Sequence, residues 1–380
     1  MKTAHISKNL FIFFLAALLI VSAGKAYSFD YKGIDLKLRA SVSEIYDDNI
    51  TFVHENEKED FITNLSFGLG VKYEGKTRSL ELTANIFQQF FADYDNFNNT
   101  SEDLTLNFQQ EFSRYDRISL RDVFTHTYEP RSFEEAFGIT RGRYSYYRNR
   151  FNLAYTKDIS RQFSISARYA SEIDEVSRED LSDSSLNRVG LDATYFPTSA
   201  TILMFSYDFS RRDFDPGGNA TIHTIAPGLR HYFTRQLYFD GKAGIDFINS
   251  YNDKNYAKPL IQASVTNDID ENSRVSISFT RRYYTNAYTQ DLFDYWQTSG
   301  TFTRRLFKRL GCSLSGFYGE GEYITTNIAD KLRGVSVGFT YDLSKKLKGN
   351  LRYTYSDVDS TIDTREYTKN KIFLGLAMEF

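Results

Sequence analysis

The chain is poor in residues that cross-link or interrupt a fold. Cys312 is its single cysteine, so an internal disulfide cannot form. It has only 5 prolines, so few extended segments are interrupted. The mean hydropathy of -0.46 excludes a bundle of membrane helices, because each such helix needs an apolar run of about 20 residues. The net charge of -3 implies no strongly basic face, so we expect no nucleic-acid partner.

Residues that could carry chemistry are scattered. The histidines are His5, His54, His126, His223 and His231, and no two of them have the i, i+2 or i, i+4 spacing of a metal site. Spacing alone leaves open a Ser–His pair of the kind used by barrel lipases, but no local signature supports one. We therefore expect no catalytic residue, no metal and no cofactor, and we predict that the protein is not an enzyme.

The first segment has the composition of a secretory signal. Two lysines precede a short apolar run at 10–23, and Ala26 and Ser28 place small residues where a signal peptidase reads. A retained helical anchor is the alternative, and the shortness of the apolar run argues against it. We expect residues 1–28 to be cleaved, which leaves 29–380 as one domain.

What the chain has in abundance is aromatic residues in an alternating pattern. It contains 28 Tyr and 33 Phe, which suit strands, and Tyr also suits a surface that is apolar on one side and wet on the other. Over 237–248, Leu237, Phe239 and Ile245 share one face, whereas Asp240 and Lys242 share the other. Segments of about ten residues with this alternation are typical of transmembrane barrel strands.

The alternating segments and their connections predict the fold. The connections alternate between short ones such as 158–161 and longer ones such as 47–60 and 129–140, as short periplasmic turns and long outer loops do. The loops are long enough to narrow a pore but hardly to fill it. We predict an all-β, up-and-down antiparallel transmembrane β-barrel of about 18 strands in the bacterial outer membrane. The expected strands lie near 36–46, 61–73, 79–93, 101–112, 117–128, 141–157, 162–174, 185–196, 201–212, 221–234, 237–248, 257–267, 274–284, 295–307, 311–320, 331–342, 348–356 and 369–380.

Several charged residues fall on the predicted inner face of these strands, and the four arginines among them are predicted at central strand positions. A charge on the lipid face at the midplane costs about 2–4 kcal/mol, so we expect such residues to point inward. There they either select a solute or an anionic polymer, or form a salt-bridged wall without selectivity. The predicted pore-lining residues are Arg168, Arg188, Asp192, Arg230, Asp240 and Arg352.

The last predicted strand ends in Phe380. Ile372, Leu374, Leu376 and Met378 share its apolar face. A terminal strand of this kind resembles the signal that the outer-membrane assembly machinery reads, so we expect that machinery as a partner, together with outer-membrane lipid and lipopolysaccharide.

Residues 46–50, YDDNI, end the first predicted strand. This stretch resembles the YDDN motif seen in a family of outer-membrane β-barrel porins associated with exopolysaccharide systems. The alternating strands and Phe380 agree with that family over the mature chain. The resemblance implies an outer-membrane channel and suggests a conduit for exopolysaccharide, with polysaccharide export proteins as partners. The resemblance identifies no catalytic or binding residues in this chain. A general or sugar-selective diffusion porin is the first alternative, and an outer-membrane enzyme or non-conducting scaffold is the second.

Overall fold

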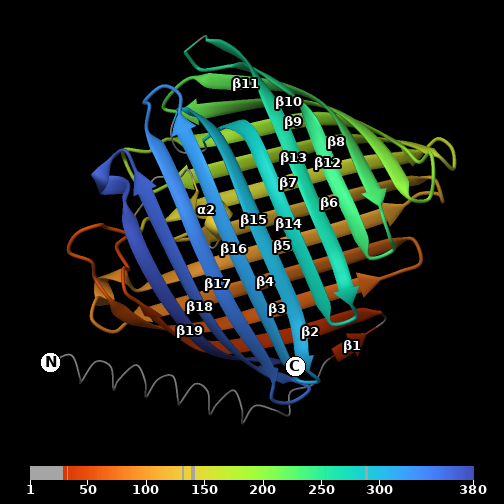
Figure 1. Cartoon of the computed structure of the whole chain (residues 1–380). Helices are drawn as coiled ribbons and strands as arrows, with labels where there is room; N and C mark the ends of the chain where they lie inside the picture. The colour runs from red at the N-terminus through yellow and green to blue at the C-terminus, as the bar shows by residue number, and fades with distance from the viewer. Residues whose placement is uncertain (1–28, 32, 131, 138–141, 253, 287–289) are drawn as a thin grey trace.

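The computed structural model describes residues 29–31, 33–130, 132–137, 142–252, 254–286 and 290–380. Strands β2 to β19 each pair antiparallel with their neighbours in sequence, and β19 pairs with β2, so eighteen strands close into a barrel (Figure 1). The elements are β1 (Phe29–Tyr31), β2 (Ile34–Asp47), β3 (Asp60–Glu74), β4 (Arg78–Phe91), η1 (Asp95–Phe97), β5 (Asn99–Glu111), β6 (Asp116–Thr127), α2 (Phe133–Ala136), β7 (Tyr146–Asp158), β8 (Phe163–Val176), β9 (Asp183–Tyr195), β10 (Thr201–Asp215), β11 (Asn219–Tyr232), β12 (Leu237–Asn249), β13 (Asn255–Asp270), β14 (Ser273–Thr285), β15 (Leu292–Phe307), β16 (Leu310–Tyr323), β17 (Ala329–Asp342), β18 (Leu347–Ser360), η2 (Asp363–Arg365) and β19 (Tyr367–Glu379).

The eighteen predicted strands each correspond to one strand from β2 to β19, so the predicted fold is confirmed. The three-residue β1, which pairs with the start of β2, was not predicted. The predicted strand 141–157 is wrong at its start, because β7 begins at Tyr146. Residues 142–145 belong to the preceding loop, where Arg143 is held by Glu129. The predicted signal segment lies outside the described residues.

The two faces of the barrel wall differ in chemistry. On the outer face Phe67, Ile277 and Leu374 expose 63%, 58% and 50% of their surface. On the inner face hydroxyls meet across neighbouring strands, as Ser278 and Ser299 do at 2.7 Å. The apolar outer face is suited to contact with lipid hydrocarbon, and the closed sheet leaves no unpaired strand edge within the hydrocarbon layer. The barrel therefore spans a membrane with its polar face inward.

Connections at the two ends of the barrel differ in length. Turns such as 112–115 and 308–309 lie at one end, whereas segments such as 48–59 and 128–145 lie at the other. In outer-membrane barrels the short turns face the periplasm. The segment 128–145 carries α2, which lies within the outline of the barrel (Figure 1). None of the helices among the described residues has the length and apolar character needed to cross a bilayer.

Candidate functional site in the lumen

The described residues of the loop 128–145 reach across the lumen to the opposite wall. It leaves β6 and returns to β7, yet Phe137 packs edge-on against Phe293 of β15, with ring centroids 5.3 Å apart. Phe137 also contacts Phe317 of β16 at 5.7 Å, and Phe133 of α2 contacts the same ring at 6.0 Å. In a barrel of eighteen strands β15 lies nine strands from β6, which is half the circumference. The loop therefore narrows the lumen from one side to the other.

Glycines in the far wall form a recess for these rings. A Cβ at Gly319 of β16 would lie 2.9 Å from the ring of Phe137, and one at Gly334 of β17 would lie closer still to the ring of Phe133. Real Cβ atoms do not approach so closely, so any larger residue at these positions would displace the loop. Glycine at a close approach of this kind is a recognised use of the residue within a strand.

A buried charge cluster ties the root of the loop to β19. The Glu129 carboxylate lies 2.7 Å from Lys371, 3.1 Å from Arg143 and 3.6 Å from Lys369. Lys369 also lies 2.9 Å from Asp47 of β2. Burial alone would raise the pKa of Glu129, but Lys371, Lys369 and Arg143 together hold that pKa below its ordinary value. Glu129 is therefore ionised at neutral pH and binds the loop electrostatically.

Further contacts order α2, the end of the loop at Tyr144 and the neighbouring loop 48–59. Ser132 caps α2 by accepting a hydrogen bond from the backbone N–H of Glu135 at 3.1 Å. Tyr144 is buried against Tyr146, and burial raises the pKa of Tyr144 to about 12. Phe52, from the loop 48–59, joins the aromatic cluster on the far wall and holds the unusual φ of +57°. A bulky residue in this conformation persists only where its surroundings enforce it.

The inner face of β7 to β10 carries a network of ion pairs, which we call the arginine wall. Its carboxylates come mainly from β8, β9 and β10, and each accepts from at least one guanidinium. The pairs are Arg148–Asp174 at 2.6 Å, Arg150–Glu172 at 2.9 Å, Arg212–Glu172 at 2.7 Å, Arg212–Asp174 at 3.3 Å, Arg168–Asp192 at 2.9 Å and Arg168–Asp208 at 3.0 Å. The network fixes these side chains against the wall, because each charge is held by an opposite one.

The inner face of β15 to β18 is different, and we call it the hydroxyl wall. It bounds a cavity of about 530 Å³ beneath α2. Among the described residues that line this cavity, Arg352 is the one arginine. The hydroxyl groups of the wall are those of Ser299, Thr301, Ser313, Ser315, Ser336, Thr354 and Ser356.

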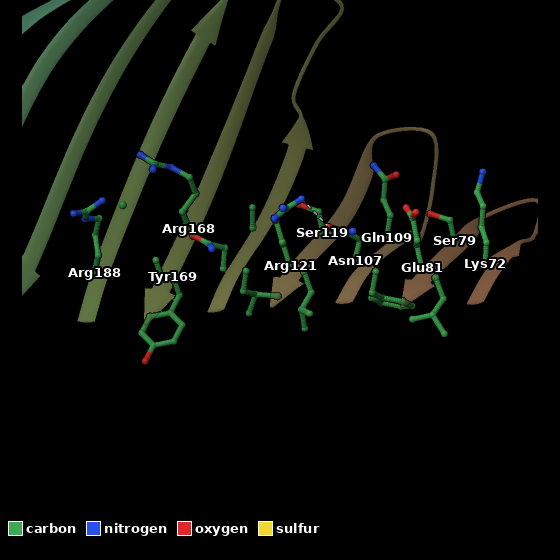
Figure 2. A pocket seen from close by; sticks show the side chains of 18 of the residues that line it. Lys72, Ser79, Glu81, Asn107, Gln109, Ser119, Arg121, Arg168, Tyr169 and Arg188 are labelled. Atoms are coloured by element: carbon green, nitrogen blue, oxygen red, sulfur yellow. Dashed lines mark hydrogen bonds between the residues drawn. The ribbon is translucent and has the colours of Figure 1, made fainter. Parts of the chain in front are cut away.

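A second cavity of about 530 Å³ lies along the inner face of β3 to β10. Figure 2 shows Arg121, Arg168 and Arg188 projecting into it from the same side of the sheet, whereas Tyr169 projects from the other side. Arg121 donates to Asn107 at 3.2 Å. The cavity lining therefore combines these arginines with carboxylates such as Glu81 and Asp208.

The six predicted pore-lining residues all lie on the inner face, in three separate places. Arg168 and Asp192 meet in the arginine wall, and Arg188 lies beside them across β8 and β9. Arg230 pairs with Asp240 at 2.6 Å, near the periplasmic end of the barrel rather than at mid-strand as predicted. Arg352 lies on the hydroxyl wall. Phe380 follows β19, and its backbone pairs with that of Leu38.

The sequence reasoning missed the charge cluster and the recess. Lys369 and Lys371 carried a usable signal, because they alternate with the apolar face of the last strand and so had to face inward. Gly319 and Gly321 form a similar signal, with small residues at i and i+2 on one face. Glu129 lies in a loop without periodicity, and nothing local in the sequence indicates its partners.

A closed antiparallel barrel with an apolar exterior, a polar lumen and an inward-folded loop gives this chain the fold of bacterial outer-membrane porins. Residues 295–380, which span β15 to β19, match the family described as "Putative beta-barrel porin 2". No curated protein is significantly similar to the chain in sequence.

Solved structures of outer-membrane proteins have the same fold. Pseudomonas aeruginosa OpdK with vanillate aligns with a TM-score of 0.50 and 10% identity, covering 91% of this chain and 98% of that one. Acinetobacter baumannii OccAB4 aligns with a TM-score of 0.51 and 9% identity over the same shares of the two chains. Pseudomonas aeruginosa OccK5 (OpdH) aligns at 0.50 with 11% identity, again covering 91% and 98%.

Proposed function

We propose that the barrel is a channel through which an exopolysaccharide chain crosses the outer membrane. The observation that supports this cargo is the hydroxyl wall, which borders a cavity beneath α2 with seven serine and threonine side chains. Each hydroxyl both donates and accepts hydrogen bonds. Such a wall can exchange hydrogen bonds with successive sugar hydroxyls without holding any one sugar unit tightly, which a moving polymer requires.

The inward loop is consistent with a single-chain cargo. Because Phe133 and Phe137 rest on the far wall, the loop divides the upper lumen and leaves less room than the bare barrel would. A thin flexible chain passes such a restriction more readily than a folded protein does. Periplasmic and inner-membrane export proteins would deliver the chain to the short-turn end.

The test combines conductance with a genetic measurement. Purified barrel in planar bilayers should conduct, and neutral oligosaccharides such as maltotriose should block the current reversibly. In cells, deletion should reduce secreted polysaccharide and leave nutrient uptake unchanged. Normal polysaccharide together with impaired uptake of small solutes would contradict the proposal. A barrel without conductance would contradict any channel function.

The docked loop also favours a second candidate, selective diffusion of small solutes. Glu129 of the loop pairs with Lys369 and Lys371 of β19 and with Arg143 at the end of the loop. The restriction is therefore a stable part of the channel. The solved OpdK structure with a similar fold contains vanillate, a small carboxylate. A steady conductance with saturable block by small acids, in cells whose polysaccharide is unaffected by deletion, would favour this candidate over export.

A further inference from the structure

Within the described part of the chain, two inward-facing arginines that have no acidic partner, Arg188 and Arg282, differ from the ion-paired arginines of the arginine wall. Arg148, Arg150 and Arg168 are each paired with a carboxylate. Among the residues that the structure describes, Arg188 of β9 and Arg282 of β14 make no ion pair and no side-chain hydrogen bond, and the Nε atom of Arg282 is buried. A guanidinium has five N–H donors, so each of these groups has its full binding capacity available.

The two arginines lie where the lumen is narrowed by a contact between β10 and β14. Above them, Arg212 of β10 reaches over to β14, where its Nε donates to Thr285 at 3.2 Å. Arg188 is opposite Ser210, two residues before Arg212 on the same face of β10. Arg282 lies three residues before Thr285 in β14. The Arg212–Thr285 contact therefore brings the inner face of β10 close to the end of β14, and Arg188 and Arg282 lie on these neighbouring parts of the wall, below that contact.

The electrostatics of this region agree with its geometry. The charge that acts most on the Arg188 guanidinium is that of Arg282, followed by the opposite charge of Asp208. Lys242 of β12 also lies within reach of Arg282 and Asp208. Asp208 is already held by Arg168 at 3.0 Å, so it does not neutralise the other three groups. Glu172 also acts on Arg188, but this acid is held by Arg150 and Arg212. Asp192 also acts on Lys242, but this acid is held by Arg168. The three cations thus share this space with acids that are each paired with another arginine.

We infer that Arg188 and Arg282 form a subsite that binds a carboxylate group of the passing cargo. Two guanidinium groups from different strands of the wall can each donate to one carboxylate, and such charge-assisted hydrogen bonds are short and strong. Arg121, on the inner face of the adjoining cavity, offers a further positive charge along the approach. The inference rests on the proposed channel and deepens it, because it makes the cargo a saccharide with acidic sugar units.

The test compares an acidic and a neutral sugar of equal length. Full-length barrel in planar bilayers is exposed to trigalacturonate or maltotriose, and the concentration that halves the current is measured for each. We expect the wild type to favour anions over cations and to be blocked about tenfold more readily by trigalacturonate, which is the effect of one good charge-assisted contact. In the double variant Arg188→Gln, Arg282→Gln that preference should fall to about twofold or less.

The matched control is Arg230→Gln, which removes an inward arginine that is already paired with Asp240. It should leave the preference for trigalacturonate unchanged. Heat-modifiable gel mobility confirms that each variant has folded. A double variant that keeps the full preference would overturn the inference. If the barrel does not conduct, the proposed function fails, and calorimetric binding of trigalacturonate to wild type and double variant still decides the subsite: equal affinities would overturn it.

Discussion

The arginine wall and the hydroxyl wall are built by the same strand geometry and use it differently. On the arginine wall the side chains are long, charged and held in place by carboxylates such as Glu172 and Asp174. On the hydroxyl wall the side chains are short, and the recess at Gly319 and Gly334 admits the aromatic rings of the loop. One wall thus carries charged side chains, and the other receives the loop that sets the width of the lumen. The predictions below test whether these two properties can be changed separately.

The largest effect is expected from Glu129→Lys. This change places a fourth cation beside Lys369, Lys371 and Arg143 and removes the carboxylate that binds them. Breaking a buried ion pair costs about 3–5 kcal/mol, which shifts loop docking by a factor of about 10²–10⁴. Single-channel conductance should therefore rise. Glu74→Lys is the control, because Glu74 is an exposed residue paired with Lys72 at the periplasmic end. Unchanged conductance in a folded Glu129→Lys barrel would contradict the claim that the docked loop narrows the channel.

A smaller change in width is expected from Gly334→Ala. The added Cβ would collide with Phe133, so the loop must shift away from the wall at a cost of about 1–3 kcal/mol. We expect higher conductance with unaltered ion selectivity, because no charge changes. Gly311→Ala is the matched control, since a Cβ at Gly311 meets nothing closer than 4.0 Å. A change in selectivity with no change in conductance would contradict the division between the walls.

Lowering the pH should reproduce part of the rise in conductance expected for Glu129→Lys. The pKa of Glu129 lies below its ordinary value of 4.5 because the folded state holds the charged form. A carboxylate with a lowered pKa contributes stability that is fully present above its ordinary pKa and is lost as pH falls below it. Conductance should therefore be constant from about pH 7 to pH 5 and rise as the pH falls from about 4.5 towards the lowered pKa of Glu129. Glu129→Gln should show the raised conductance at every pH. Equal conductance of wild type and Glu129→Gln at about pH 7 would contradict the role of Glu129.

The smallest effect is expected from the hydroxyl wall itself. Replacing Ser313, Ser315 and Ser336 by alanine removes weak hydrogen-bonding sites without moving the loop. Each neutral hydrogen bond contributes about 0.5–1.5 kcal/mol when it forms, and a sliding chain uses few of them at once, so block by maltotriose should weaken by about two- to tenfold. Block by trigalacturonate should change less, because it depends mainly on the arginines. Equal losses for both sugars would mean that the two walls do not act separately.

The fold was predictable because a strand repeats every two residues and a barrel requires that repeat throughout. The period located all eighteen barrel strands and placed Arg168, Arg188 and Arg352 on the inner face. It could not predict the path of the loop 128–145. That path depends on contacts between Phe137 and Phe293, which are far apart in sequence and meet only once the barrel has closed. The pairing of Glu129 with Lys371 has the same origin.

The ladder between β2 and β19 joins the first barrel strand to the last. A chain that runs up and down can make such a seam antiparallel only if its strands are even in number. Loss of any hairpin would keep this parity and permit a smaller ring of sixteen strands. Loss of one strand would force a parallel seam or leave an open edge in hydrocarbon, where unpaired backbone groups cost several kcal/mol each. The unit by which such a barrel can grow or shrink is therefore the hairpin.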